Sequence, residues 1–257
     1  MRILPYLDDW LLCAPTEQQA VQDSRLLLRH VQKLGFSVNE KKSCLIPSQT
    51  TTFIGMTLNS CLMSASLSQE RVTNILQLLA RFRPGVSLQY EVVLRLIGML
   101  TKATVVIPLG LLHLRSLQLW HNSLRLDPTR HRHRLFIISH RCIRALRRWR
   151  QLEFLKAGVP LGVVPSRREL VTTDASLTGW GATWNRRGIC GHWTSIQATE
   201  HINLLELRAV FLALKYFMPV LAGRHVLVRS DNTSTVFHLN HQGGTRSRRS
   251  LRLLTRF

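Results

Sequence analysis

Three acidic residues in the C-terminal third of the chain have positions typical of metal ligands. Asp174 follows the strand-like segment 170–173. Asp231 follows 225–230, in which apolar and polar residues alternate. Glu206 lies on the apolar face of a predicted helix, where a carboxylate is unfavourable unless its charge is compensated. If the three acids converge, a divalent cation bound to their oxygens, by preference Mg²⁺, would offset their repulsion. The alternative is that each acid is solvated or paired with an arginine. The apolar residues of that helix face are Ile202, Leu205, Ala209, Ala213 and Phe217.

A second acidic pair, Asp8 and Asp9, lies near the start of the sequence between two short apolar runs. This pattern predicts a β-hairpin over 3–12 with the two aspartates at its tight turn, where both carboxylates can reach the same side. The alternative is an ordinary polar turn, in which Asp-Asp is common. The dipeptide alone therefore does not assign a metal site.

The elements that would support this hairpin follow it along the chain. A helix is predicted from Thr16, whose side chain would cap it, to Gly35, which would end it. The segment 52–58 is predicted to form a pair of strands. We expect one face of the helix to be buried in this part of the chain. The residues of that face are Leu27, Leu28, Val31 and Leu34.

The central part of the chain is predicted to be helical and strongly basic. Amphipathic helices are expected from Ser68, from near Ser87 and after Pro108. A further helix over 141–150 would have apolar residues on one side and arginines on the other. Such a basic face indicates phosphate binding, although a solvated surface is the alternative.

The C-terminal part begins after a stiff Gly- and Pro-containing linker, 158–165, and has its own order of elements. Its patterns predict three strands, a long helix, a fourth strand and another helix. The acids described above lie at the ends of the first and fourth strands and inside the long helix. The predicted strands span 169–175, 178–185, 188–194 and 224–230, and the helix spans 199–218.

Charge is the strongest property of the whole composition. The 257 residues include 35 lysines and arginines against 14 acids, a net charge of +21. The segment 66–168 has 18 basic and 4 acidic residues, so most of the surplus is central. A surplus of this size indicates a polyanionic partner, most commonly nucleic acid. A ribosomal-type assembly and anionic lipid are the alternatives.

Other features exclude several classes of protein. A hydrophobic fraction of 45% allows one large domain or two smaller ones with real cores. The five cysteines are scattered and form no C-x-x-C pair, which argues against a disulfide framework or a structural zinc site. We expect no secretory leader and no membrane span. Within the most apolar region, 92–120, the longest run without a charged residue or histidine is 103–112, which is shorter than the roughly 20 residues of a membrane span. We expect an intracellular chain, cytoplasmic or nuclear, without membrane contact; the sequence indicates no oligomeric state.

The N-terminal motifs resemble those of reverse transcriptases. Residues 6–9, Tyr-Leu-Asp-Asp, are similar to the Y-x-D-D signature of that family. The segment 35–42 is similar to its G-x-x-x-N-x-x-K segment, and 52–58 is similar to the F-x-G strand pair that grips the primer. By this resemblance, 1–65 is the C-terminal part of a polymerase palm and 66–165 is a basic helical thumb and connection.

The C-terminal region resembles ribonuclease H over residues 166–245. The β-β-β-α-β-α order and the three acidic blocks match that family one by one. The resemblance implies an α/β (α+β) chain in which 166–257 forms a mixed, nominally five-stranded sheet flanked by helices, with the last strand missing. The order of the regions would be palm, thumb and connection, then ribonuclease H.

The resemblance also implies functional residues. Asp174, Glu206 and Asp231 would hold two Mg²⁺ ions and direct hydrolysis of RNA within an RNA–DNA hybrid. Asp8 and Asp9 would bind two Mg²⁺ ions beside a template and primer. Mn²⁺ is the alternative ion at both sites. The residues expected to contact nucleic acid are Tyr6, Lys42, Ser176, Asn203, Asn232, Arg246, Arg248 and Arg249.

Two short segments, 231–236 and 242–247, look most like the polymerase proteins of DIRS-type retroelements, which use a tyrosine recombinase. Hepadnavirus-like polymerases are more distant relatives with a similar layout. We therefore expect a retrotransposon origin for this reverse transcriptase and ribonuclease H chain.

The sequence departs from both families at its ends. A reverse transcriptase needs a further aspartate and the fingers upstream of the hairpin, and only five residues precede Tyr6. Ribonuclease H has a fourth acid after a later strand and helix. We expect a fragment that makes no DNA alone and whose nuclease site lacks one carboxylate. The alternative function is a catalytically inactive, basic module that only binds nucleic acid.

Overall fold

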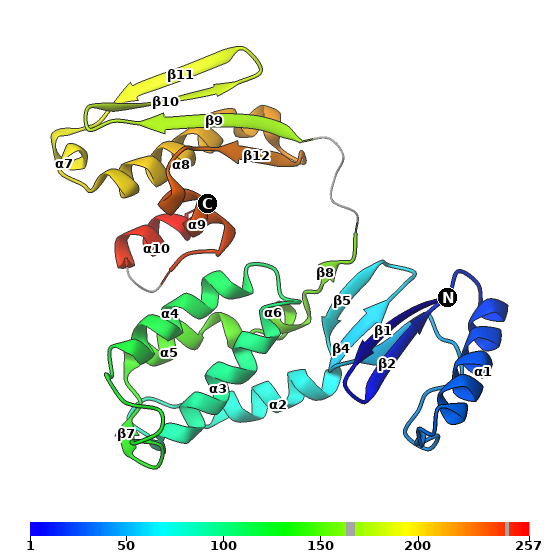
Figure 1. Cartoon of the computed structure of the whole chain (residues 1–257). Helices are drawn as coiled ribbons and strands as arrows, with labels where there is room; N and C mark the ends of the chain where they lie inside the picture. Colours follow the sequence, from blue (N-terminus) through cyan, green and yellow to red (C-terminus); the bar gives the residue numbers. More distant parts are fainter. Residues whose placement is uncertain (163–167, 245–246, 257) are drawn as a thin grey trace.

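The computed structural model of the chain describes residues 1–162, 168–244 and 247–256 (Figure 1). It has a mixed α/β fold, as the sequence predicted, with helices and four small sheets. Within the described part of the chain, no helix combines the length and hydropathy that crossing a bilayer requires.

The N-terminal hairpin is present, with a turn displaced by one residue from the predicted position. Its strands are β1 (Arg2–Tyr6) and β2 (Asp9–Cys13). The turn consists of Leu7 and Asp8, not of the two aspartates, and Leu7 has the left-handed φ of +49°. Asp9 pairs with the last residue of β1 as the first residue of β2. The two carboxylates therefore stand on different elements of the hairpin.

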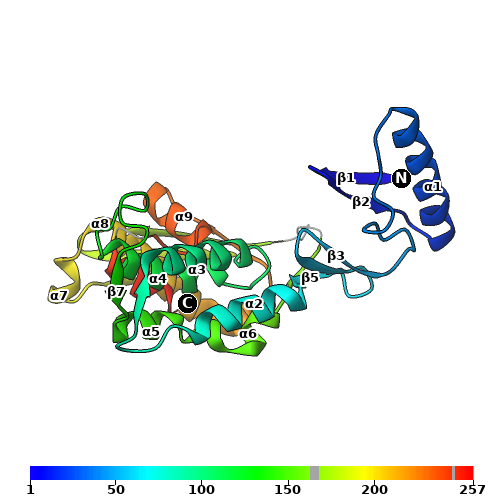
Figure 2. The ribbon, with the colours of Figure 1, turned by 90° about the horizontal axis from the view of Figure 1, so that it is seen from below.

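The helix after the hairpin, α1 (Glu17–Lys33), begins and ends as predicted. The Thr16 side chain accepts a hydrogen bond from the Gln19 backbone N–H, and Gly35 follows the helix with φ of +85°. The predicted buried face is wrong, because Leu34 is 62% exposed and its companions are only half-buried. Figure 2 shows β1, β2 and α1 projecting from the rest of the chain, away from the core of the central helices.

An antiparallel sheet follows, with the strand order β3-β4-β5-β8. Three of its strands are consecutive, and β8 is formed by Val159–Pro160, which pairs with β5. The linker predicted over 158–165 is therefore partly a strand, and its end lies outside the described residues. The other strands are β3 (Thr50–Phe53), β4 (Met56–Asn59) and β5 (Ser64–Leu67).

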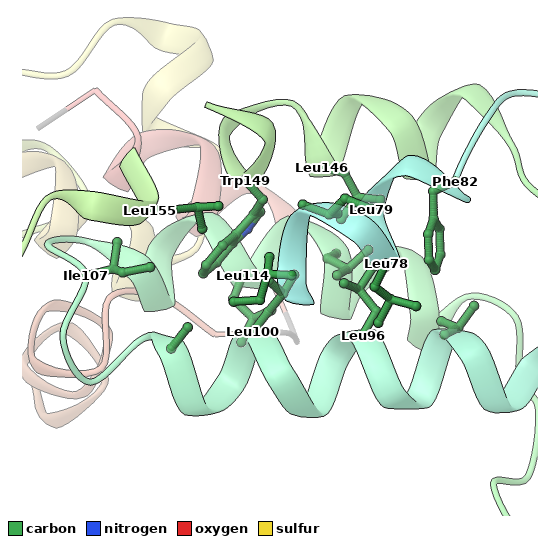
Figure 3. Packing of buried hydrophobic residues seen from close by; sticks show 14 of the residues in the cluster. Leu78, Leu79, Phe82, Leu96, Leu100, Ile107, Leu114, Leu146, Trp149 and Leu155 are labelled. Carbon is green, nitrogen blue, oxygen red and sulfur yellow. The ribbon is translucent and has the colours of Figure 1, made fainter. Parts of the chain in front are cut away.

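The central region is a helical block with the largest core of the chain. Figure 3 shows leucines from successive helices packed around Trp149 and Phe82, both fully buried. The second helix begins at Tyr90, later than predicted, because Ser87–Gln89 pairs as β6 with β7. The elements are α2 (Gln69–Ala80), β6, α3 (Tyr90–Ala103), α4 (Gly110–Asn122), β7 (Leu135–Ile137), α5 (His140–Leu146), the 3₁₀-helix η1 (Arg148–Arg150) and α6 (Leu152–Lys156).

The arginine-rich segment predicted as one helix over 141–150 divides into α5 and η1. Leu146 and Trp149 are buried in the core of the block, as the amphipathic pattern indicated. The arginines on the other side, including Arg144 and Arg147, are exposed. The block thus presents a basic face opposite its core.

The C-terminal unit contains a mixed four-stranded sheet with the order β11-β10-β9-β12. Strand β12 is parallel to β9, and the other pairs are antiparallel. The order of strands and helices matches the prediction, with one additional short helix before the long one and one at the end. The elements are β9 (Glu169–Ala175), β10 (Gly179–Trp184), β11 (Arg187–His192), α7 (Ser195–Ala198), α8 (Ile202–Leu221), β12 (Val226–Arg229), α9 (Thr233–Asn240) and α10 (Arg248–Leu254).

Helix α8 packs along one face of this sheet. This packing sets the distance between the side chains of α8 and the strands. Val171 of β9 and Trp184 of β10 form a buried cluster with Ala213 and Phe217 of α8. A second cluster joins the C-terminal unit to the helical block through α4, α8 and α10. Its buried members are Leu112, Leu204, Leu207, Leu251, Leu253 and Leu254.

Two hydrogen bonds cross the same junction. The backbone N–H of Leu112 donates to Gln242 Oε1 at 3.2 Å, and Arg115 Nη2 donates to the carbonyl of His241 at 3.1 Å. In Figure 1, α10 lies between α4 and the sheet of the C-terminal unit. Polar and apolar contacts together therefore hold the C-terminal unit against α4.

Candidate metal site

The three C-terminal acids come together at one edge of the sheet. Asp174 is the next-to-last residue of β9, and Asp231 lies two residues after β12. Because these strands are parallel neighbours, their carboxyl ends meet. Glu206 reaches the same point from the second turn of α8. One carboxylate oxygen from each acid lies within 4.8 Å of the other two.

Glu206 is the electrostatically unusual member of this triad. The residue is 4% exposed, whereas Asp174 and Asp231 are exposed. The pKa of Glu206 is raised to about 7, first by burial and then by the charges of Asp174 and Asp231, while a hydrogen bond from the Ala175 backbone N–H opposes the rise. The buried Oε2 atom of Glu206 has no hydrogen-bond partner among the described residues.

The donor set fits a divalent cation. Among the described residues, no lysine, arginine or histidine forms an ion pair with any of the three acids, so the alternative of arginine pairing is not seen. Carboxylate oxygens are the ligands that hard cations such as Mg²⁺ prefer. A bound cation would give the free Oε2 atom of Glu206 a partner and offset the repulsion between the acids.

Two asparagines predicted to contact nucleic acid lie beside the triad and bind each other. Asn232 Nδ2 donates to Asn203 Oδ1 at 3.0 Å, and Asn203 Nδ2 donates to Ser234 Oγ at 3.2 Å. Asn232 also caps α9, because its Oδ1 accepts from the backbone N–H of Thr235. Ser234 was not among the predicted site residues, although its place as the second residue of a helix capped by Asn232 is a usable sequence signal.

Ser176, the third predicted contact beside the triad, closes the turn between β9 and β10. Its Oγ accepts from the backbone N–H groups of Thr178 and Gly179. The residue is exposed, so the hydroxyl both shapes the turn and faces solvent.

The N-terminal acids have a different environment. Asp8 and Asp9 are exposed, and no described acid, histidine or cysteine joins them in a group of three possible metal ligands. Tyr6 is 51% exposed on the hairpin. Lys42 lies in an exposed turn and donates its backbone N–H to Asn39. The described residues thus supply two carboxylates to this site, in contrast to the three that converge in the C-terminal unit.

The predicted basic contacts near the end of the chain lie at the start of α10. Arg248 and Arg249 are exposed in its first turn, and Arg246 lies outside the described residues. The sequence patterns did not predict α10, whose leucines are buried in the junction with α4. Its signal was the Ser247 cap followed by closely spaced leucines.

Comparison with known proteins identifies solved structures of similar fold. No protein-family profile and no curated protein matches the chain. A foamy viral protease–reverse transcriptase solved in complex with an RNA/DNA hybrid matches 99% of this chain and 34% of its own length, at 15% identity and a TM-score of 0.50. The same type of protein in complex with double-stranded DNA matches 99% of this chain and 52% of its own length, at 15% identity and a TM-score of 0.46.

The chain therefore spans between a third and about half of the length of these structures. The likeness shows an α/β fold with the arrangement of reverse transcriptase and ribonuclease H proteins, as the sequence resemblance implied. At this level of identity the comparison concerns the fold, and the chemistry rests on the site described above.

Proposed function

We propose that the C-terminal unit is a metal-dependent ribonuclease H that hydrolyses the RNA strand of an RNA–DNA hybrid. The observation that carries the proposal is the convergence of Asp174, Glu206 and Asp231 around an uncompensated buried carboxylate. The fold supports it, since a protein of similar fold has been solved with an RNA/DNA hybrid.

Each acid of the triad has its own role in the proposed hydrolysis. Bound Mg²⁺, two ions by the family resemblance, would supply a water of lowered pKa and positive charge beside the departing oxygen. Asp174 and Asp231 face solvent and can hold the cation at the substrate side. Glu206 would hold it from the α8 side and would have to release its proton to do so, because its pKa is about 7. The oxygen of water bonds to phosphorus while the bond to the 3′ oxygen breaks, and that oxygen takes up a proton.

Substrate binding in this proposal depends on side chains around the triad and on the basic surface. Ser176, Asn203 and Asn232 would contact the backbone or the 2′-hydroxyl of RNA, the group that distinguishes the two strands. Arg248 and Arg249, together with Arg246 beyond the described residues, would bind phosphates. The exposed arginines of α5 extend the positive surface.

For the N-terminal hairpin we propose the role of a polymerase palm remnant. Asp8 and Asp9 would bind Mg²⁺ or Mn²⁺, with Tyr6 and Lys42 near the template and primer. RNA-directed DNA synthesis would require a further carboxylate that the described residues do not supply. A DIRS-type retroelement remains our proposal for the origin of the chain.

The test uses the purified chain, Mg²⁺ and a hybrid labelled on its RNA strand. We expect cleavage by the unaltered chain and none by the Asp174→Asn variant. Glu153→Gln, which removes an exposed carboxylate of α6, is the matched control and should cleave normally. Binding of the hybrid without cleavage at every Mg²⁺ and Mn²⁺ concentration would favour the alternative function, a basic module that only holds nucleic acid.

A further inference from the structure

The asparagine pair beside the triad links the two segments that carry Glu206 and Asp231. Asn203 precedes Glu206 by three residues, so the two side chains share one side of α8. Asn232 is the immediate neighbour of Asp231. The hydrogen bond of 3.0 Å between the two amides therefore joins the first turn of α8 to the start of α9.

This link is reinforced from both ends. Asn203 Nδ2 donates to Ser234 Oγ at 3.2 Å, which adds a second bond between α8 and α9. Asn232 is fixed by its capping bond to Thr235 and by its own backbone N–H, which donates to Ser230 Oγ at 3.2 Å. The two residues that flank Asp231 are thus bonded to each other, and Asn232 is bonded to α8 as well.

The segment around Asp231 needs such support. Strand β12 is four residues long and pairs, among the described strands, with β9 alone. Repulsion between the carboxylates of Glu206 and Asp231 pushes that segment away from α8 when both are charged. A neutral amide bridge opposes this movement without adding charge, and it leaves one N–H of each amide group for other contacts.

We propose that Asn203 and Asn232 are positioning residues, which set the separation of Glu206 and Asp231 before a divalent cation binds. This role rests on the proposed metal-dependent function and adds to it. It also explains why an asparagine stands at the cap of α9, where serine would cap equally well. Serine cannot reach across and donate to Asn203.

The experiment measures binding of Mn²⁺ to the full chain without nucleic acid, by the loss of the free-ion signal in electron paramagnetic resonance. Every protein compared also carries Asp8→Asn and Asp9→Asn, so that binding at the hairpin does not contribute. Asn232→Ser keeps a capping oxygen and removes the amide bridge, so it is the decisive variant. Asn203→Ala removes the amide on the α8 side of the bridge. Asn39→Ser is the matched control. The Asn39 side chain accepts a similar hydrogen bond from a backbone N–H in an exposed turn, far from the triad in the sequence.

We expect each bridge variant to bind Mn²⁺ about 5-fold more weakly, the effect of losing one partly buried hydrogen bond. The double variant should bind no more weakly than the weaker single variant, because both changes remove the same bridge. Asn39→Ser should bind as the unaltered chain does.

Two results would overturn the inference and leave the proposed function intact. The first is an equal Mn²⁺ affinity in Asn232→Ser and the unaltered chain. The second is a loss of Mn²⁺ affinity in the double variant that equals the product of the losses in the two single variants. Absence of Mn²⁺ binding by the unaltered chain would overturn the metal-dependent function together with the inference. Circular dichroism of each variant establishes that it is folded, and the preserved cap keeps Asn232→Ser informative if Asn203→Ala unfolds.

Discussion

The raised pKa of Glu206 predicts that the metal-free chain loses stability as the pH rises. The ordinary pKa of a glutamate is 4.5, and burial raises that of Glu206 to about 7 in the folded chain. Between these two values the folded chain retains a proton that the unfolded chain has released. The free energy of unfolding therefore falls as the pH rises through this window and levels off above about pH 7.

The size of the loss follows from the size of the shift. A rise from 4.5 to about 7 corresponds to about 3 kcal/mol, at about 1.4 kcal/mol for each pH unit. Two of the responsible charges, Asp174 and Asp231, are exposed, and solvent screens them. We therefore expect a loss of about 2 kcal/mol between pH 5 and pH 8.

The assay compares thermal unfolding of the unaltered chain with that of Glu206→Gln in the presence of EDTA. Glutamine has nearly the same shape and no charge to lose, so the difference between the two proteins isolates the titration of Glu206. We expect Tm of the unaltered chain to fall by roughly 4–8 °C relative to Glu206→Gln between pH 5 and pH 8. Saturating Mg²⁺ should reverse the fall by binding the folded state. A difference in Tm that does not vary with pH would refute the reasoning, and Glu153→Gln controls for loss of any carboxylate.

Three other predictions follow from the packing and charge. Leu251→Ala should lower the free energy of unfolding by about 2–5 kcal/mol, because this buried side chain joins α10 to α4. Urea denaturation measures the loss, and an unchanged free energy of unfolding would contradict the role of the junction. Replacing Arg248 and Arg249 by alanine should weaken hybrid binding and reduce the slope of log affinity against log salt by about 2, measured by fluorescence anisotropy; an unchanged slope would remove both from the phosphate contacts. Limited proteolysis should cut within 1–48 first, because this segment contains a single buried residue, Asp23; early cuts within α2 or α3 instead would contradict it.

The sequence predicted the convergence of the three acids because its signals are local. The strand before Asp174 has the strand period, and Glu206 is separated from its apolar neighbours by helical spacing. Their convergence then follows from the parallel pairing of β9 and β12. The pKa of Glu206 could not be predicted in the same way, since it depends on distances between residues far apart in the chain.

The errors came from features that depend on tertiary contacts. Leu34 has the pattern of a core residue, but burial requires a partner surface, and no described element covers it. Strands β6 and β8 have three and two residues, too few for any periodicity to be read. The leucines of α10 are buried because α4 and α8 lie beside them, and no local pattern in the sequence records that contact.

The pairing of β5 with β8 has a consequence for the architecture of the chain. Ala65 pairs with Val159, and Ser64 with Pro160, so the helical block starts and finishes at adjacent backbone positions. The cost of closing such a long loop grows only slowly with its length, and the pair can form after the block has folded. The block is therefore an insertion whose two ends lie side by side in one sheet. Joining 64 to 160 through a short turn would yield a circularly permuted block, in which new termini could be opened at the exposed loop before β7.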